Sequence, residues 1–324
     1  MKILKLTMLS CFFIFIASTN CSENLNLLVK DSLLGNLREI EIIDANCSDA
    51  VVKLVKDGND KLYVLKQINH EEISEQFLLI RDLVASHFGA ICEILLNKVL
   101  LISAKQNSDI KFYTDRAATL HFFCKGKNLE KYKPDFLSKE FCLQQKFCNP
   151  GSIWQKIPIK EDEQGLTRNV IESMTIHEDL PKIVAFDTFI GNSDRSFPNI
   201  FYNSNQNNFY GIDQAAAFNR KNLPKIAYDR LKELYDRGYF NKCNSKIIEA
   251  LKIYQETLKI LHEKIRPKHV SALFEIYSQN IELEKSESSF TKKRSEWHTK
   301  NFKKNWKSTI DLIELLNKIL EMKH

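Results

Sequence analysis

Two aspartates and an asparagine in one short stretch have the side chains and spacing of a metal-dependent site. Asp194 precedes Asn199 by five positions, and Asp213 follows a strand–turn–strand pattern over 200–212. Phosphoryl transfer needs such residues, because its transition state is crowded with negative oxygens and depends on metal ions and on a carboxylate that orients the acceptor. Amide and carboxylate oxygens suit Mg²⁺. The order predicts that Asp194 orients an acceptor and that Asn199 and Asp213 bind the metal.

Two sequence motifs carry these three residues. Residues 190–199 read IGNSDRSFPN and residues 212–218 read IDQAAAF. The motifs resemble the catalytic and metal-binding loops of the atypical kinases, specifically the HipA-like and phosphatidylinositol 3-/4-kinase-like group. That group shows Ile-Gly-Asn-x-Asp-Arg-His-x-x-Asn followed by Ile-Asp-x-x-x-x-Phe. Ser196 stands where the group usually has His, a departure that removes no metal ligand.

The resemblance implies a role for each of these residues. Asp194 orients or deprotonates the acceptor, Asn199 binds metal, and Asp213 chelates metal against the phosphates of ATP. Arg195 is expected beside them as a catalytic residue that binds the loop or a substrate phosphate, or pairs with Asp187 or another acid. The implied cofactors are ATP and Mg²⁺. The implied fold is α+β and protein-kinase-like, with a small β-rich N-lobe containing one main helix and a mostly helical C-lobe.

The upstream half has the elements that such a site needs. Two β-rich runs, 51–55 and 62–68, flank the turn cluster 57–60, which is the signature of a β-hairpin. The second run places Lys66 among apolar residues. By the resemblance, this lysine holds the α- and β-phosphates.

A helix is expected after the hairpin, over 71–96, because its apolar residues recur at helical spacing. An acidic residue on it would orient Lys66, and Glu75 is the first choice, with Glu72 as the substitute. Short apolar runs at 99–102 and 118–123 suit strands. His121 in the second run is interpreted as an ordinary polar residue.

The loops around the nucleotide are the weaker part of the resemblance. The loop 46–50 should cover the phosphates, yet it contains no glycine, so Ser48 and backbone amides would have to bind them. The lobe-connecting hinge is expected within 120–126. The whole chain has only 9 glycines and 7 prolines, which disfavours turn-rich sandwiches and propellers.

The remainder is expected to be helical. A helix over 182–190, opened by Pro181, should stop at Gly191, and a long helical region over 225–283 should break at Pro267. Residues 284–307 are charged without apolar periodicity, which predicts a mobile connection, and Ser308 should cap a final amphipathic helix. The expected organisation is a signal peptide (1–22), an N-lobe (23–124), a C-lobe (125–283) and a basic connection with a C-terminal helix (284–324).

The amino terminus has the features of a secretory signal. Two lysines precede the apolar run 6–17, which is too short for a mature transmembrane helix, and small residues follow it. Lipidation at Cys21 is disfavoured by Asn20. Six cysteines remain in the exported chain and permit disulfides, of which Cys142–Cys148 would be local, but the connectivity cannot be deduced.

The charge pattern adds one candidate surface. The chain of 324 residues has a formal charge of +6, which does not demand nucleic acid. Lysines and aromatic residues alternate over 292–307, a pattern that suits an anionic membrane surface or nucleic acid, or a solvated helix face. Nucleic acid is the less favoured partner.

The sequence thus predicts an exported, ATP-dependent kinase that transfers the γ-phosphoryl group to a protein Ser/Thr or to an inositol lipid. Two alternatives stay open. One is a catalytically weak kinase-like module that engages a partner or an anionic membrane, as the glycine-free loop and Ser196 suggest. The other is nucleotidyl transfer on the same fold.

Overall fold

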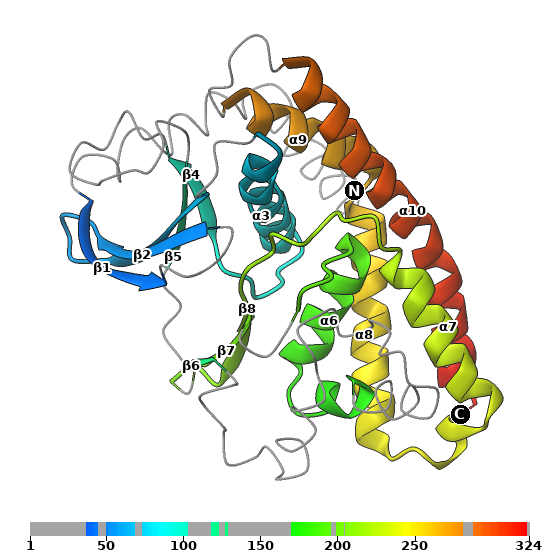
Figure 1. Cartoon of the computed structure of the whole chain (residues 1–324). Helices are drawn as coiled ribbons and strands as arrows, with labels where there is room; N and C mark the ends of the chain where they lie inside the picture. The colour runs from blue at the N-terminus through cyan, green and yellow to red at the C-terminus, as the bar shows by residue number, and fades with distance from the viewer. Residues whose placement is uncertain are drawn as a thin grey trace, which may run out of the picture.

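The computed structural model describes residues 37–44, 50–68, 73–102, 118–122, 127–128, 170–195, 199–203, 205–280 and 288–322. These residues form a β-rich lobe and a mostly helical lobe (Figure 1), which confirms the expected two-lobed α+β architecture. The predicted signal peptide, all cysteines except Cys92 and Cys243, Ser48 and most of the expected hinge lie outside the described residues.

The β-rich lobe is built on one antiparallel sheet. Its strands follow the order β1-β2-β3-β5-β4. They are β1 (Arg38–Asp44), β2 (Ala50–Lys56), β3 (Leu62–Ile68), β4 (Val99–Ile102) and β5 (Ala118–Phe122). The register places Lys66 of β3 between Val52 of β2 and Thr119 of β5. The expected hairpin is β2–β3, so Lys66 lies in the middle of the sheet and not at an edge.

The turn of this hairpin is organised by one carboxylate. The side chain of Asp57 accepts hydrogen bonds from the backbone N–H groups of Asn59 (2.9 Å) and Lys61 (3.0 Å) and from the hydroxyl of Tyr63 (3.0 Å). Burial opposes the charge of Asp57, but these hydrogen bonds outweigh it and lower its pKa. The carboxylate therefore stabilises the folded state only while it is ionised.

Replacing Asp57 by Ala should reduce the free energy of unfolding by about 1–3 kcal/mol at pH 7, because the buried Tyr63 hydroxyl loses its acceptor. A folded-state pKa below the unfolded value gives stability that is complete above the unfolded pKa of about 3.9 and is lost as the pH falls below it. Urea denaturation of both proteins should therefore show a difference that shrinks below about pH 4. Asp60→Asn, at an exposed carboxylate in the same turn, is the control and should change little. A difference that is independent of pH would contradict this assignment.

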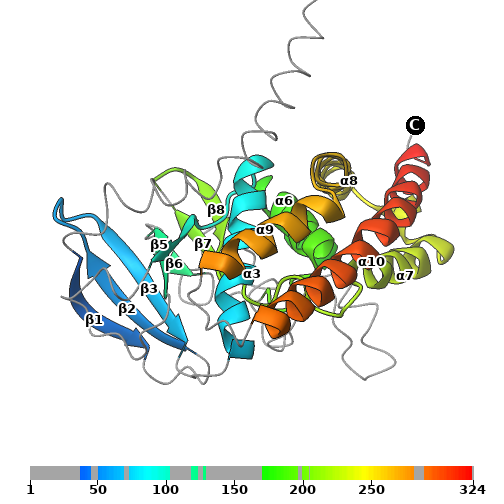
Figure 2. The same cartoon turned by 90° about the horizontal axis from the view of Figure 1, so that it is seen from above.

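Helix α3 (Ile73–Ile91) lies between the sheet and the helical lobe, where it contacts β4 and α9 (Figure 2). It buries Phe77, Ile80, Leu83 and Val84, as its periodicity predicted. The helix ends five residues earlier than expected, at a turn in which Glu93 adopts a left-handed conformation with φ of 58°. The strand-like residues that follow pair with the helical lobe: the N–H of Gly211 donates to Leu95 O at 3.0 Å.

In the helical lobe, α6 (Asp179–Ile190) is buried along almost its entire length. Gly191 ends this helix in a left-handed conformation with φ of 73°, as expected for a glycine C-cap. A three-stranded sheet of β6 (Lys127–Asn128), β7 (Ile200–Asn203) and β8 (Asn208–Gly211) follows. The predicted strand–turn–strand pattern is thus confirmed.

Four longer helices complete this lobe: α7 (Leu223–Asp236), α8 (Ser245–Lys264), α9 (Pro267–Asn280) and α10 (Ser288–Glu321), with the short 3₁₀ helix η4 (Tyr239–Lys242) after α7. The break at Pro267 is confirmed, and a second break at Gly238, with φ of 70°, was not predicted. None of the described helices is long and apolar enough to span a membrane.

One prediction about this lobe was wrong. Residues 288–307 are not a mobile connection but the first half of α10, a single helix of 34 residues in which Ser308 is an internal position. The buried face of this half is mostly polar: it includes Ser295, His298 and Asn305, with Phe302 among them. An analysis of apolar periodicity cannot detect a helix whose buried face is made of polar side chains.

Candidate active site

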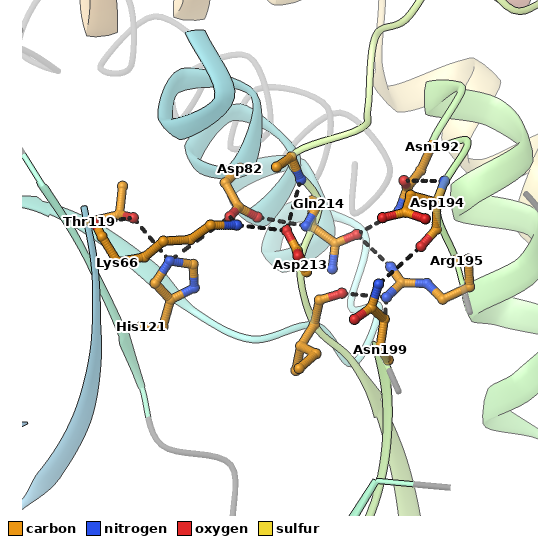
Figure 3. A network of polar contacts seen from close by, with 12 residues as sticks. Lys66, Asp82, Thr119, His121, Asn192, Asp194, Arg195, Asn199, Asp213 and Gln214 are labelled. Carbon is orange, nitrogen blue, oxygen red and sulfur yellow. Dashed lines mark hydrogen bonds and ion pairs between the residues drawn. The ribbon is translucent and has the colours of Figure 1, made fainter. Parts of the chain in front are cut away.

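Three separate segments bring the candidate residues together between the lobes (Figure 3). Lys66 comes from β3, Asp194 and Asn199 come from the loop after α6, and Asp213 comes from the segment after β8. The stretch from the end of α6 to Phe218 carries Asp194, Asn199 and Asp213. A backbone hydrogen bond joins its two ends, because Phe218 N–H donates to Ile190 O at 2.9 Å.

The Lys66–Asp213 ion pair is the centre of the site. Lys66 Nζ lies 2.8 Å from Asp213 Oδ1, which also accepts a hydrogen bond from Ala215 N–H at 3.4 Å. Desolvation opposes the charge of Asp213, but Lys66 more than compensates and lowers its pKa to about 2. Asp213 adopts a left-handed conformation with φ of 54°, which Asp tolerates better than most residues. The structure thus brings together two residues that are 147 positions apart and that the sequence analysis assigned separately, one to the phosphates and one to the metal.

The acidic residue that the structure places beside Lys66 on α3 is Asp82, which the sequence analysis missed. Asp82 is 1% exposed, and its Oδ2 lies 3.7 Å from Lys66 Nζ and 3.8 Å from His121 Nε2. Its Oδ1 accepts a hydrogen bond from Gln214 N–H at 2.7 Å. Asp82 therefore ties the lysine to the residue that follows Asp213.

Glu75, which we expected in this role, lies seven residues before Asp82, or about 10 Å along the helix axis. Its side chain and that of Glu72 lie outside the described residues, so this part of the prediction stays open. His121 is more than an ordinary polar residue, because it is buried beside Asp82 and lies 2.9 Å from Thr119 Oγ1. Burial lowers the pKa of His121, which favours the neutral imidazole.

Arg195 is fully buried and holds together the two segments that carry the candidate metal ligands. Its Nε donates to Asp187 Oδ2 at 2.7 Å, and its Nη2 donates to Asp187 Oδ1 at 3.0 Å and to Gln214 Oε1. Its Nη1 donates to the backbone oxygens of Asn199, at 2.7 Å, and of Ile212. The expected pairing with Asp187 is confirmed. The expectation that Arg195 could bind a substrate phosphate is wrong, because its side chain has no exposed surface. Arg195 is therefore a positioning residue.

The loop between Asp194 and Asn199 is closed by its own side chains. Asn199 Nδ2 donates to Asp194 O at 3.0 Å, and Asp194 N–H donates to Asn192 Oδ1 at 3.3 Å. The carboxylate of Asp194 is exposed. The nearby protein still raises its pKa by desolvation, and the negative charge of Asp213 raises it further. A raised pKa makes the carboxylate a better proton acceptor.

The oxygen atoms that would hold a metal are available. Among the described residues, none donates a hydrogen bond to Asn199 Oδ1 or to Asp213 Oδ2. Hard oxygen ligands of this kind fit Mg²⁺, which takes only one or two protein ligands when substrate phosphates complete its shell. The residues present therefore fit a magnesium–nucleotide complex, which Asn199 and Asp213 would hold, and Lys66 lies beside Asp213.

No protein-family model matches the chain, and no curated protein sequence is significantly similar to it. Among solved structures, it is similar to the proinflammatory kinase CtkA of Helicobacter pylori, with 13% identity over 86% of this chain and 97% of that one and a TM-score of 0.46. It is also similar to a Golgi casein kinase with Mn and ADP bound (12% identity, 92% and 75%, TM-score 0.36). An aminoglycoside phosphotransferase from Alicyclobacillus acidocaldarius shows 9% identity over 89% and 95%, with a TM-score of 0.28.

All three TM-scores are below 0.5. The order of the elements and the position of Lys66 opposite Asp213 define a two-lobed, kinase-like fold in this chain itself. The finer resemblance to the HipA-like and phosphatidylinositol 3-/4-kinase-like group stays a prediction.

Proposed function

We propose that this protein is an exported, ATP-dependent kinase that transfers the γ-phosphoryl group to a hydroxyl of a protein Ser/Thr or of an inositol lipid. The observation that carries the proposal is the 2.8 Å Lys66–Asp213 pair, with Asn199 and Asp194 on the adjacent loop. A partly buried lysine, two available oxygen ligands and a proton-accepting carboxylate form the set of groups that phosphoryl transfer needs.

Each residue has a distinct task in this proposal. Lys66 binds the α- and β-phosphates, which requires it to exchange part of its contact with Asp213 for phosphate oxygens. Asn199 and Asp213 hold Mg²⁺, which when bound neutralises charge on the phosphates. Asp194 orients the acceptor hydroxyl and accepts its proton. Asp82 holds the lysine in place, and Arg195 fixes the backbone that carries both metal ligands.

The position of a label in ATP tests this proposal directly. The full-length protein should transfer label from the γ-phosphate to mixed protein and phosphoinositide acceptors in the presence of Mg²⁺, and chelation of the metal should stop the transfer. Transfer of an α-label would show nucleotidyl transfer instead. ATP binding without transfer would favour a kinase-like binding module, and no ATP binding would refute the assignment.

Export is the second part of the proposal and is supported by the basic, then apolar, then small-residue order at the amino terminus. Protein recovered outside the producing cell should begin near residue 23. An intact amino terminus starting at Met1 on that material would contradict cleavage.

Binding to an anionic membrane surface is the second candidate function, and the outer face of α10 favours it. Six lysines are exposed on one face of its first half and lie within about 22 Å along the axis. They are Lys292, Lys293, Lys300, Lys303, Lys304 and Lys307. Among the described residues, none forms an ion pair with any of them. Unpaired like charges along a helix disfavour it slightly, so an anionic partner would relieve their repulsion.

Vesicle sedimentation tests this surface. Each lysine near an anionic bilayer contributes about 1 kcal/mol, so reversing Lys300, Lys304 and Lys307 to Glu should weaken binding to phosphatidylserine vesicles by at least about 100-fold. Lys318→Glu, on the mixed-charge end of the same helix, is the matched control. Equal binding to neutral phosphatidylcholine vesicles would refute the proposal, and preferential binding to duplex DNA would replace the membrane by nucleic acid.

A further inference from the structure

The inner face of α10 meets the chain at both ends of the segment 191–222, which carries Asp194, Asn199 and Asp213. His298, Phe302 and Asn305 follow one another at spacings of four and three residues, so they lie on one side of the helix. All three are at most 1% exposed. In Figures 1 and 2 this helix runs along the outside of the helical lobe, against α7 and α9.

His298 contacts the part of the segment 191–222 that follows Asp213. Its Nδ1 lies 3.1 Å from the backbone oxygen of Phe218. Burial lowers the pKa of His298 to about 3, so the ring is neutral. A carbonyl oxygen can only accept, so Nδ1 must be the protonated nitrogen and the donor. The ring is held in place by stacking on Phe274, with centroids 5.0 Å apart and planes 5° apart, and on Phe77 at 5.6 Å.

Asn305 holds both outer ends of the same segment. With its amide oxygen facing Gly191, it accepts from Gly191 N–H at 3.2 Å and its nitrogen donates to Lys221 O at 3.3 Å. Position 191 needs a glycine for two reasons. Its φ is 73°, in the left-handed region, and a Cβ atom there would lie 2.4 Å from the Asn305 side-chain amide. One turn further on, Ser308 Oγ accepts a hydrogen bond from Asn222 Nδ2 at 2.9 Å.

Phe302 fills the space between these two polar contacts. Its ring packs against Phe189 of α6 at 5.2 Å and against Phe218 at 5.9 Å, both in edge-to-face geometry. The start and the end of the segment are therefore fixed to one helix face, and not only to each other.

The contact at Phe218 is transmitted towards Asp213 through a single turn. Phe218 adopts a left-handed conformation with φ of 57°, and Ala217 N–H donates to Gln214 O at 2.9 Å. Gln214 in turn contacts Asp82 through its N–H and Arg195 through its side chain. A shift at Phe218 would move Gln214, and with it the neighbouring metal ligand Asp213.

We propose that His298 and Asn305 are positioning residues that clamp the catalytic segment to α10 and thereby set Asp213 relative to Asp194. The consequence for activity rests on the proposed kinase function, whereas the clamp itself does not. The clamp requires the N–H donor of His298 and the two hydrogen bonds of the Asn305 side-chain amide. Both side chains are buried and contact no substrate.

Two substitutions of His298 separate its hydrogen bond from its stacking. His298→Phe keeps the aromatic stack and removes the donor, whereas His298→Asn keeps a nitrogen donor near the Nδ1 position and removes the stack. Asn305→Leu removes both amide hydrogen bonds at similar volume. Ser295→Ala is the matched control, because Ser295 is a buried polar residue of α10 whose hydroxyl contacts Ser278 of α9 and not the catalytic segment.

The first measurement is hydrogen–deuterium exchange of the full-length protein without nucleotide, together with its melting temperature. His298→Phe and Asn305→Leu should accelerate exchange of amides within 212–218 by about tenfold or more, whereas His298→Asn should preserve their protection despite a lower melting temperature. Ser295→Ala should leave this segment unchanged. The clamp is refuted if exchange in 212–218 follows the melting temperature across all four variants.

The second measurement is steady-state phosphotransfer. His298→Phe and Asn305→Leu should lower kcat by about 10–100-fold, as expected for a small displacement of catalytic groups from a distance, and His298→Asn should retain more activity than His298→Phe. Wild-type rates in the two donor-free variants, despite faster exchange, would refute the link to Asp213. A wild-type protein without phosphotransfer would refute the kinase proposal alone, because the exchange measurement still decides the clamp.

Discussion

Asp194→Asn should lower kcat for phosphotransfer by about 10²–10⁴-fold, the range expected for loss of a general base, while the KM for ATP stays close to that of the wild type. Asp194 is exposed, and its backbone oxygen, not its carboxylate, holds Asn199. Asn is nearly isosteric with Asp, so the loop keeps its shape and only the proton acceptor is lost. An equal fall in kcat and kcat/KM is the kinetic sign of an interaction made only in the transition state.

Asp213→Asn is the matched comparison for Asp194→Asn, because it should impair binding of ATP–Mg²⁺ as well as kcat. Its carboxylate pairs with Lys66 at 2.8 Å, so the substitution removes a charge that both the lysine and the metal need. We expect weaker binding of ATP–Mg²⁺ and a higher metal requirement in addition to a lower kcat. Steady-state kinetics at several Mg²⁺ concentrations, with ATP binding measured separately, distinguish the two variants. If Asp194→Asn also lost ATP binding, or kept near-wild-type kcat, Asp194 would not be the acceptor-orienting residue.

The elements around the site were predictable because each is encoded locally. The alternating run that ends at Ile68, the turn at Asp57 and the helical spacing from Phe77 to Val84 need only neighbouring residues to be recognised. Gly191 likewise ends α6 through its own backbone conformation. Local patterns of this kind give the order of elements, and the order placed Lys66 ahead of Asp213.

The partners of the predicted residues were not predictable in the same way. Asp82 contacts Lys66 and Gln214 from a helix face that also contains buried apolar residues, and nothing in its local sequence distinguishes it from an exposed helix carboxylate. Asp187 lies inside an apolar helix, where Arg195 and the side-chain amide of Asn192 both bind its carboxylate, and the sequence analysis named it only as one possible partner of Arg195. Long-range pairs are invisible to a one-dimensional pattern, and they are the contacts that orient the site.

The first half of α10 was mispredicted for a related reason. Its inner face uses Ser295, His298 and Asn305 in place of leucines, because these side chains satisfy backbone groups and polar partners of the segments they contact. Apart from Phe302, the buried apolar residues of this helix therefore begin only at Leu312. His298 and Asn305 on this face contact irregular backbone, which in this chain belongs to the segment 191–222.

Arg195→Met should reduce the free energy of unfolding by about 3–5 kcal/mol, because it leaves Asp187 buried and unpaired. The side chains of Arg195 and Asp187 are 0% and 5% exposed, so water cannot replace the missing partner. The matched control is Arg237→Met, at the residue that follows α7. Its ion pair with Glu233 at 2.9 Å is solvent-exposed and should contribute under about 1 kcal/mol. Urea denaturation of both variants measures the difference.

A double variant, Arg195→Met with Asp187→Leu, separates stability from positioning. Replacing a buried ion pair by apolar side chains of similar volume is often neutral or stabilising, so much of the lost stability should return. Activity should not return, because the backbone oxygens of Asn199 and Ile212 still lack the guanidinium that holds them together. If the double variant recovered both stability and phosphotransfer, Arg195 would serve only to neutralise Asp187, and the metal ligands would be positioned without it.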